Sequence, residues 1–327
     1  MVSQDPVVIV GGGFAGVYTT RALLKQGVPV TLVSDENHFT FTPLLHEVAT
    51  GSLLPNDIIF EYESFFHSKA FHFIRGRVED LDPQKKIIRL AGGHSLNYSF
   101  LVIATGAITN LTQVAGSENA FVLKDVHDAV KLKSAILARA QNYNRHVAVS
   151  VVGGGPTGLE LVFDVDLMLR ALRKKNPNSH YTLRVIHGSD VFCSMSAPPI
   201  QQYVRRALEK AGIEIVCNAM AQEITREEII TSQGRFHSDV TILCAGVLPN
   251  TSMLGPLKRD EKGHVPVNDY LQTLENPSIF ALGDIITLNG MPVSKLAQTA
   301  VREASVVAAN IQSLIKGNEP RAQYKPH

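Results

Sequence analysis

Two clusters of three glycines have a spacing that can bind the diphosphate of a nucleotide. They are Gly11, Gly13 and Gly16 in the first cluster and Gly153, Gly155 and Gly158 in the second. In such a GxGxxG turn, the first glycine makes a tight turn, the second lets backbone approach a pyrophosphate, and the third lets helix pack on strand. The helix that follows offers free N–H groups and a partial positive charge to the phosphates. Two dinucleotide-binding turns are therefore predicted.

The elements around the clusters repeat one order, strand–turn–helix–strand. The first set is a strand over 7–10, a helix to about Lys25 and a strand over 28–33; the second is a strand over 146–152, a helix over 159–175 and a strand over 181–186. Short, continuously apolar strands are typical of a parallel sheet buried on both faces. The clusters lie too far apart to be halves of one dinucleotide fold. We therefore expect an α/β protein with two Rossmann-like domains, the second inserted in the first.

Further elements flank these units. The segment 71–89 alternates as strands do, with a turn signal at Asp82-Pro83. Short apolar strands are expected over 239–244 and 279–282, and an alanine-rich helix over 295–314.

An acidic residue at the end of the second strand would hold the ribose hydroxyls of a bound nucleotide. In the first unit Ser34 falls near that position, and Asp35 is the expected ligand, with Glu36 as the alternative. In the second unit the position is taken by His187, either as a cofactor contact or as a strand-end surface histidine. A carboxylate at this position would favour NADH by repelling the 2′-phosphate of NADPH. A histidine gives no such selection, so the preference between NADH and NADPH stays open.

Composition narrows the class of protein. The chain has 327 residues, 45% hydrophobic and 19% charged, with a formal net charge of +1, which gives no field to recruit nucleic acid. No apolar run reaches the roughly 18–20 residues that span a bilayer, and the N-terminal sequence MVSQDPVVIV shows no secretory signal. Scattered Cys193, Cys217 and Cys244 indicate a reducing compartment. We expect a cytoplasmic protein, or one peripheral on the cytoplasmic membrane face, with no metal site.

Five elements, in this order, resemble the flavin oxidoreductases that use pyridine nucleotides and contain two dinucleotide folds. The matching segments are 7–16, the strand ending in Ala104-Thr105-Gly106, 151–160, Cys244-Ala245-Gly246, and Phe280-Ala281-Leu282-Gly283-Asp284. Within this superfamily, FTPLLHEVATG at 41–51 and KLAQTA at 295–300 resemble type II NADH dehydrogenases and the related quinone reductases similar to apoptosis-inducing factor.

The resemblance implies FAD in a domain of 1–112 plus 270–327 and NAD(P)H in a domain of 113–269. Asp284 would contact the flavin's ribityl-phosphate region. Beyond the six glycines, Asp35 and His187, the expected cofactor-binding residues are Phe14, Ala15, Thr105, Gly106, Gly283, Asp284 and Ala297 for FAD, and Pro156, Thr157 and Gly246 for NAD(P)H.

Three side chains are expected to act in catalysis. Glu160 matches a glutamate that lies near the nicotinamide in the similar family; the alternative is an exposed helix residue. Gln298 would orient the electron acceptor, unless it is a helix-surface glutamine with no role. His46, expected in a flavin-side loop, would donate a proton to reduced quinone, since imidazole titrates near neutral pH; a solvated loop histidine is the alternative.

The expected activity is electron transfer from NAD(P)H through flavin to an acceptor, a quinone above all. Two alternatives stay open: a reductase of a small ferredoxin- or rubredoxin-type protein, and a flavin-based redox sensor without efficient turnover. Similar proteins continue past a tyrosine-containing stretch like that at Tyr324 into a C-terminal region with a membrane anchor. The resemblance thus implies peripheral membrane contact through a region absent here, and we also expect a homodimer.

Overall fold

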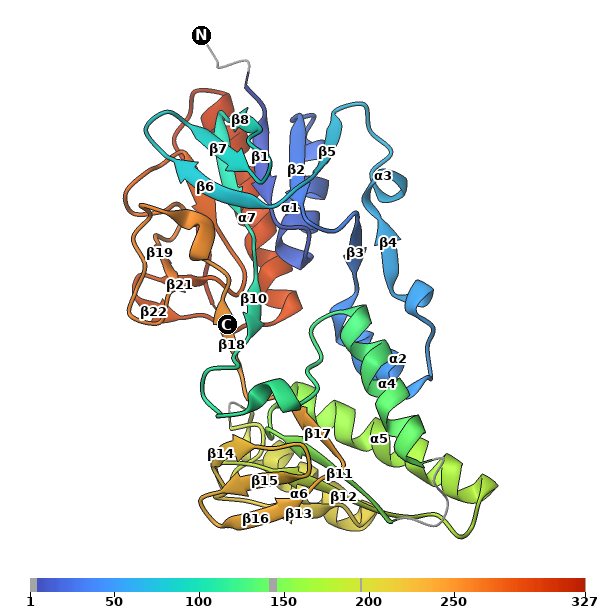
Figure 1. The fold of residues 1–327 in the computed structure, drawn as a ribbon. Coiled ribbons are helices and arrows are strands. Elements are labelled where there is room, and N and C mark those ends of the chain that lie inside the picture. Colours follow the sequence, from blue (N-terminus) through green and yellow to red (C-terminus); the bar gives the residue numbers. More distant parts are fainter. Residues whose placement is uncertain (1–4, 141–145, 195, 327) are drawn as a thin grey trace. The chain divides into compact units, whose positions relative to one another are not determined.

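The computed structural model describes residues 5–140, 146–194 and 196–326, which form two compact units (Figure 1). The first consists of Met1–Thr40, Ile59–Ile108 and Leu248–His327, and the second of Phe41–Ile58 and Thr109–Val247. Of the N-terminal stretch read for a secretory signal, the first four residues lie outside the described part. The chain passes between the units within β10 (Ala107–Thr109) and β18 (Val247–Pro249).

The first unit is built on a parallel five-stranded sheet in the order β20-β9-β1-β2-β5. The strands are β1 (Val7–Val10), β2 (Val30–Ser34), β5 (Phe71–Arg75), β9 (Phe100–Ile103) and β20 (Ile279–Ala281). Numbered along the chain and starting from the β5 edge, this order is 3-2-1-4-5, which matches the first five strands of the Rossmann order. Every residue of β1 is buried, as a strand between two layers requires. The first predicted dinucleotide fold is confirmed.

Helices α1 (Phe14–Lys25) and α7 (Ala297–Ile315) pack side by side in this unit (Figure 1). Their buried faces are rich in small residues, such as Gly16 on α1 and Ala304 on α7. Small side chains let the two backbones approach closely. Each buried valine or leucine of the two helices, such as Val17, Leu23 and Val307, contributes about 1.5–3 kcal/mol through its burial. The helix expected over 295–314 is confirmed and begins two residues later, at Ala297.

Smaller antiparallel elements complete the first unit. They are β3 (His38–Thr40) with β4 (Ile59–Glu61); β6 (Val78–Asp82), β7 (Ile87–Leu90) and β8 (Ser95–Asn97); β21 (Ile286–Leu288) with β22 (Met291–Pro292); helix α3 (Tyr62–Phe65) and the 3-10 turn η4 (Ser252–Leu254). Strand β19 (Val265–Val267) pairs in parallel with β21. The alternating segment 71–89 divides, because β5 joins the parallel sheet and β6 pairs with β7 across the turn at Asp82, whose carboxylate accepts the Lys85 backbone N–H.

The second unit repeats the plan with the sheet order β13-β12-β11-β17, again parallel. Its strands are β11 (His146–Val152), β12 (His180–Ile186), β13 (Glu214–Val216) and β17 (Val240–Leu243); its longer helices are α4 (Val126–Ala140), α5 (Pro156–Lys175) and α6 (Pro198–Ala211). An antiparallel sheet of β14 (Ala221–Ile224), β15 (Glu228–Thr231) and β16 (Gly234–His237) and the 3-10 turn η3 (Ser117–Asn119) complete it. The α/β class with two Rossmann-like folds is therefore confirmed.

The segment 41–58 belongs to the second unit, although the sequence places it with the first. It forms the 3-10 turns η1 (Thr42–Leu44) and η2 (Pro55–Asp57) around helix α2 (Leu45–Thr50), which ends at the left-handed Gly51. Leu45, Val48 and Ala49 are buried in one core with residues of α4 and α5. Residues 248–269 likewise pack with the first unit. The domain boundaries predicted from the sequence separate the two dinucleotide folds, whereas the two units are defined by which residues pack together.

Asn310 ties helix α7 to the chain's last described segment. Its amide Nδ2 donates to the carbonyls of Tyr270 (3.1 Å) and Ala322 (2.8 Å), and its Oδ1 accepts the N–H groups of Arg321 (3.0 Å) and Ala322 (2.9 Å). The residue is fully buried. One side chain thus satisfies four backbone groups.

We predict that Asn310→Ala lowers the free energy of unfolding by about 2–4 kcal/mol, since each such bond contributes about 0.5–1.5 kcal/mol and its loss strands buried partners. Urea unfolding followed by circular dichroism measures it. Asn318→Ala, at an exposed position near the end of the same helix, is the control and should change stability by less than about 0.5 kcal/mol. Equal stability of the two variants would contradict the assignment.

Candidate functional site

The first glycine turn leaves no room for side chains at two positions. Gly11 has φ +108°, and a Cβ built there would lie 2.2 Å from the carbonyl oxygen of Ala104. A Cβ on Gly16 would lie 1.8 Å from the carbonyl oxygen of Gly11. Strand β1, strand β9 and the start of α1 therefore meet backbone to backbone, which only glycine permits.

The second turn repeats these contacts. Gly153 has φ +121°, and its Cβ would lie 2.3 Å from the carbonyl oxygen of Cys244; a Cβ on Gly158 would lie 2.1 Å from the oxygen of Gly153. Two segments far apart in sequence thus adopt the same strained geometry for the same packing reason.

The glycines between them, Gly13 and Gly155, face open space. Within the described residues no atom lies within 4 Å of a Cβ built on either. Both take the N-cap position of their helix with extended backbone, and no described side chain caps the helix there. The helix starts of α1 and α5, which no described side chain caps at Gly13 or Gly155, therefore offer an open surface that suits an anionic diphosphate. The turns fit the two nucleotides that the sequence predicts.

The glycine after the first of each cluster, Gly12 or Gly154, is covered by an aromatic ring that the sequence did not reveal. The hydroxyl of Tyr62 donates to the Gly12 carbonyl at 2.8 Å. Burial, more than the neighbouring Asp35 and Glu36 carboxylates, raises the pKa of Tyr62 to about 12, so the phenol stays protonated as a donor. In the second unit the ring of Phe192 lies against Gly154.

The predicted ribose ligand Asp35 is exposed directly after β2, next to buried Ser34. Its backbone carbonyl accepts the Nε–H of Arg75 at 3.0 Å. Its neighbour Glu36 is exposed as well, so both carboxylates remain available at the strand end where a ribose hydroxyl would arrive.

His187, the corresponding residue of the second unit, is built into the turn. Its Nδ1 accepts the Gly154 N–H at 3.1 Å, and its Nε2 lies 3.2 Å from the Val191 carbonyl, to which it can donate. The ring stacks on Phe192, with centroids 5.6 Å apart. Desolvation lowers the pKa of His187. Both ring nitrogens are thus used inside the protein, and neutral His187 acts as a brace of the turn rather than as a strand-end surface histidine.

Three further predicted cofactor residues follow the carboxyl ends of parallel strands. Thr105 and Gly106 follow β9, and the Thr105 hydroxyl donates to the Asn250 carbonyl at 2.6 Å. Gly246 follows β17 with φ +97°. In an open parallel sheet, ligands bind beyond the carboxyl ends of the strands, where these residues lie.

Gly283 and Asp284 follow β20, and a buried carboxyl that the sequence did not indicate supports them. The N–H of Gly283 donates to Oε2 of Glu303 on α7 at 2.6 Å. Glu303 is fully buried, and its Oε1 has no hydrogen-bond partner in the described part of the chain. Burial above all, with a smaller effect of Asp284, raises the pKa of Glu303 to about 8.

The remaining predicted residues lie at helix starts. Ala297 and Gln298 begin α7, where Gln298 is exposed. Phe14 and Ala15 begin α1; Phe14 packs edge-on against Phe39 with centroids 5.0 Å apart. Pro156 and Thr157 lie at the corresponding place in the second unit, the first turn of α5, where both are exposed.

His46 lies on helix α2, not in a loop as predicted, because the apolar residues around it pack as one helical face on α4 and α5. Its Nδ1 lies 2.6 Å from Oδ2 of Asp164, and its Nε2 lies 3.9 Å from Oε2 of Glu160. The structure thus brings together two predicted catalytic residues and adds Asp164, which the sequence analysis missed. The one feature of the sequence that could have indicated Asp164 is its position one helical turn after Glu160.

The three cysteines are free thiols, all in the second unit. Burial raises the pKa of Cys244 to about 12, and burial together with Glu160 raises the pKa of Cys193. Cys217 accepts from the Arg205 guanidinium at 3.5 Å. Disulfide chemistry needs a reactive thiolate, and two of these thiols are held protonated.

These features define a flavin oxidoreductase with two dinucleotide folds. The chain belongs to the pyridine nucleotide-disulphide oxidoreductase family, whose model matches residues 5–304. Within it, the chain is similar to a type II NADH:quinone oxidoreductase of Mycobacterium tuberculosis, with 28% identity over 98% of this chain and 74% of the relative. Ferroptosis suppressor protein 1 of Xenopus laevis is 27% identical over 95% of this chain and 81% of the relative.

A solved structure shares the fold. The NADH complex of NDH2 from Plasmodium falciparum has a TM-score of 0.88 at 19% identity, covering 99% of this chain and 87% of that one. The predicted family and its fold are confirmed. No described helix combines the length and the apolar character that crossing a bilayer requires.

We predict that Glu303 makes stability fall as pH rises from about 4.5, its ordinary value, to about 8. The folded state keeps a proton in this window that the unfolded state has lost, so raising the pH favours unfolding by up to about 1.4 kcal/mol per pH unit. Glu303→Gln should remove this slope and gain stability over the wild type between pH 5 and pH 8.

Urea unfolding at pH 5, 6.5 and 8 measures the difference. Glu319→Gln, at an exposed glutamate of the same unit, is the control and should keep the wild-type slope. Parallel pH curves for wild type and Glu303→Gln would show that Glu303 is ionised in the folded protein.

Proposed function

We propose that this chain is an FAD-dependent NAD(P)H:quinone oxidoreductase. The observation that carries the proposal is the pair of glycine turns, each with a helix start left uncapped by the described residues and an open glycine where a diphosphate would lie. Two such turns provide for two nucleotides. The likeness to type II NADH:quinone oxidoreductases over almost the whole chain supports the acceptor.

FAD would bind the first unit and NAD(P)H the second. Backbone N–H groups at Gly13 and the start of α1 would hold the flavin diphosphate, Asp35 its adenosine ribose, and Asp284 its ribityl-phosphate region. Bound FAD would supply the two-electron chemistry of the reaction. The uncapped start of α7, at Ala297, would favour negative charge on the flavin ring, and Gln298 would orient the acceptor.

In the second unit, Gly155, Pro156 and Thr157 would receive the diphosphate of NAD(P)H, with Gly246 beyond the next strand. His187 stands where a carboxylate would repel the 2′-phosphate of NADPH. Because its ring is neutral and both nitrogens are engaged with Gly154 and Val191, it does not attract that phosphate either. We therefore expect use of both NADH and NADPH, within about tenfold, a difference of only about 1.4 kcal/mol.

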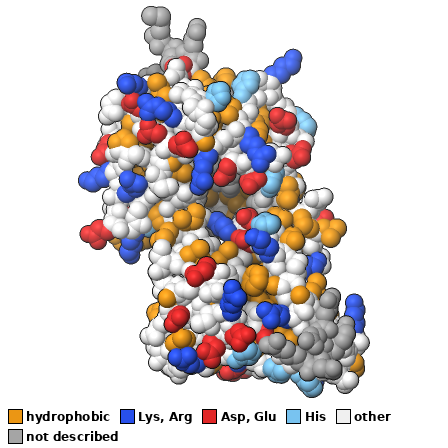
Figure 2. Space-filling view, in the orientation of Figure 1, with side chains coloured by type: hydrophobic (Ala, Val, Ile, Leu, Met, Phe, Trp, Pro, Cys, Tyr) orange, Lys and Arg blue, Asp and Glu red, His pale blue; other side chains and the backbone are white. Residues whose placement is uncertain are grey.

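The surface charge favours a small acceptor over an acidic electron-transfer protein. Figure 2 shows Lys and Arg side chains interspersed with Asp and Glu over the visible face, in keeping with the net charge of +1. Docking of an acidic partner usually relies on a field of one sign. The proposal also includes a homodimer and, as the resemblance implies, peripheral contact with the cytoplasmic face of the membrane.

We predict that the purified yellow protein bleaches with NADH or NADPH under anaerobic conditions and regains its colour with a soluble quinone, over many turnovers. Absorbance near the flavin band and steady-state rates measure both steps. Bleaching without turnover would instead indicate a sensor, and turnover only with a ferredoxin-type protein would indicate the reductase.

A second prediction separates the two nucleotide sites. Gly13→Val and Gly155→Val should both fold, because the described structure leaves a Cβ free at either position, but the new side chain would keep a diphosphate from the backbone. Gly13→Val should lose flavin, whereas Gly155→Val should keep it and raise KM for NADH by about tenfold or more.

Flavin absorbance per protein and steady-state kinetics measure the two effects, and each variant serves as the control for the other. Full flavin content in Gly13→Val would refute the assignment of FAD to the first turn.

A further inference from the structure

Three ionisable side chains meet on one face of the second unit. Glu160 and Asp164 are four residues apart on α5 and so share a helix face. His46 on α2 contacts both: Nδ1 lies 2.6 Å from Oδ2 of Asp164, and Nε2 lies 3.9 Å from Oε2 of Glu160. The side chains are graded in exposure, with 17% for His46, 22% for Asp164 and 56% for Glu160.

The chemistry of the partners fixes which ring nitrogen exchanges protons. A carboxylate only accepts, so Nδ1 of His46 carries a hydrogen and donates it to Asp164. Nε2 is then the nitrogen that can gain or lose a proton, and it faces Glu160. The separation of 3.9 Å is longer than a hydrogen bond, but a small rotation of half-exposed Glu160, or one bridging water, closes it.

The surroundings hold His46 in place. Leu45 and Val48, on either side of it along α2, are buried in the core shared with α4 and α5. Other ionisable groups near the trio are Lys133 of α4, whose side chain lies against Gly51 at the end of α2, Glu47 of α2, and Cys193, whose pKa Glu160 helps to raise. The ring is therefore fixed by packing, with its exchangeable nitrogen turned toward the exposed acid.

Quinone reduction needs a proton that NAD(P)H does not supply. The balanced reaction is NAD(P)H + H⁺ + quinone → NAD(P)⁺ + hydroquinone. The two electrons and one hydrogen come from the nucleotide, whereas the second O–H of the hydroquinone requires a proton from solvent. Reduction of ferricyanide, which takes one electron at a time and no proton, has no such requirement.

We propose that Asp164 is a positioning residue that stabilises His46 as the proton donor for quinone reduction, with Glu160 as the group that recharges it. This rests on the quinone reductase activity proposed above. In the step, the Nε2–H bond of the His46 imidazolium breaks as an O–H bond forms on the acceptor. The freed Nε2 lone pair then takes a solvent proton, which the exposed Glu160 carboxylate accepts and passes on, so that the carboxylate is regenerated. No electrons pass through these residues.

The test compares two acceptors in Asp164→Asn holoenzyme. Asparagine keeps the shape of the side chain but loses the charge that stabilises the imidazolium. In anaerobic stopped-flow, we expect reoxidation of the pre-reduced variant by a soluble short-chain ubiquinone analogue to slow by about 10–100-fold. This is less than the effect of a whole general acid, about 10²–10⁴-fold, because His46 itself remains. Reoxidation by ferricyanide and reduction by NADH should stay within about twofold, and Asp164→Glu, which keeps the charge, should recover part of the quinone rate.

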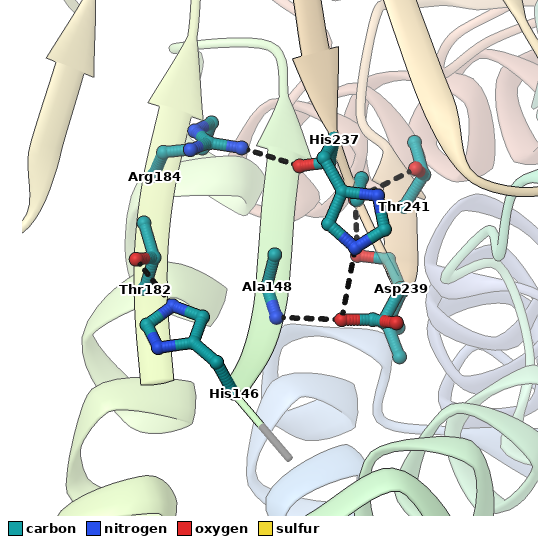
Figure 3. A network of polar contacts seen from close by, with 9 residues as sticks. His146, Ala148, Thr182, Arg184, His237, Asp239 and Thr241 are labelled. Carbon is teal, nitrogen blue, oxygen red and sulfur yellow. Dashed lines mark hydrogen bonds and ion pairs between the residues drawn. The ribbon is translucent and has the colours of Figure 1, made fainter. Parts of the chain in front are cut away.

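A matched control comes from another His–Asp pair of the same unit. His237 lies 3.5 Å from Asp239, which accepts the Ala148 N–H at the amino ends of β11 and β17, opposite the glycine turn (Figure 3). His237→Gln removes an exposed imidazole there and should leave both reoxidation rates unchanged.

The outcomes separate cleanly. A solvent deuterium isotope effect on the quinone step that increases in Asp164→Asn supports the proposal. Equal losses with quinone and ferricyanide would show a merely structural role for Asp164, and an unchanged quinone rate would show no role; either overturns the proposal. Wild-type enzyme that reduces ferricyanide but no quinone would instead refute the proposed function.

Discussion

The site depends on backbone atoms that approach one another where no side chain can fit. At Gly11 and Gly16, and again at Gly153 and Gly158, a Cβ would lie 1.8–2.3 Å from a carbonyl oxygen. This contact locks the end of the first strand against both a neighbouring strand and the following helix. No described side chain caps the start of either helix, so each turn can bind an anion without any charged side chain.

Side chains support these turns more than they form them. Tyr62 covers Gly12 and Phe192 covers Gly154. His187 bonds to the second turn through one ring nitrogen and to Val191 through the other. Each of the hydrogen-bonding groups is neutral, since burial raises the pKa of Tyr62 and lowers that of His187. A neutral brace leaves the positive end of the helix dipole as the main local field, which suits a bound diphosphate.

The arrangement divides the chemistry between cofactor and protein. Electron transfer belongs to the flavin, and the thiols of Cys193 and Cys244, both with raised pKa, are poorly suited to replace it. What the protein contributes is the position of the cofactors and the local electric field, and in the proposal above also the proton. Its ionisable groups are set accordingly: Glu303 is neutral and buried behind Gly283, whereas His46, Asp164 and Glu160 extend from the protein interior to solvent.

Local sequence determined the parts of this protein that depend on local backbone geometry. The strands over 7–10 and 146–152 have the predicted bounds, and the glycine spacings predicted both turns. Both features depend only on residues that are adjacent in the sequence. The tertiary structure decided the rest. Helix α2 belongs to the second unit because its apolar face packs against α4 and α5. His46 met Asp164 across 118 positions, and Glu303 met Gly283 across 20, through packing between elements that no local pattern encodes.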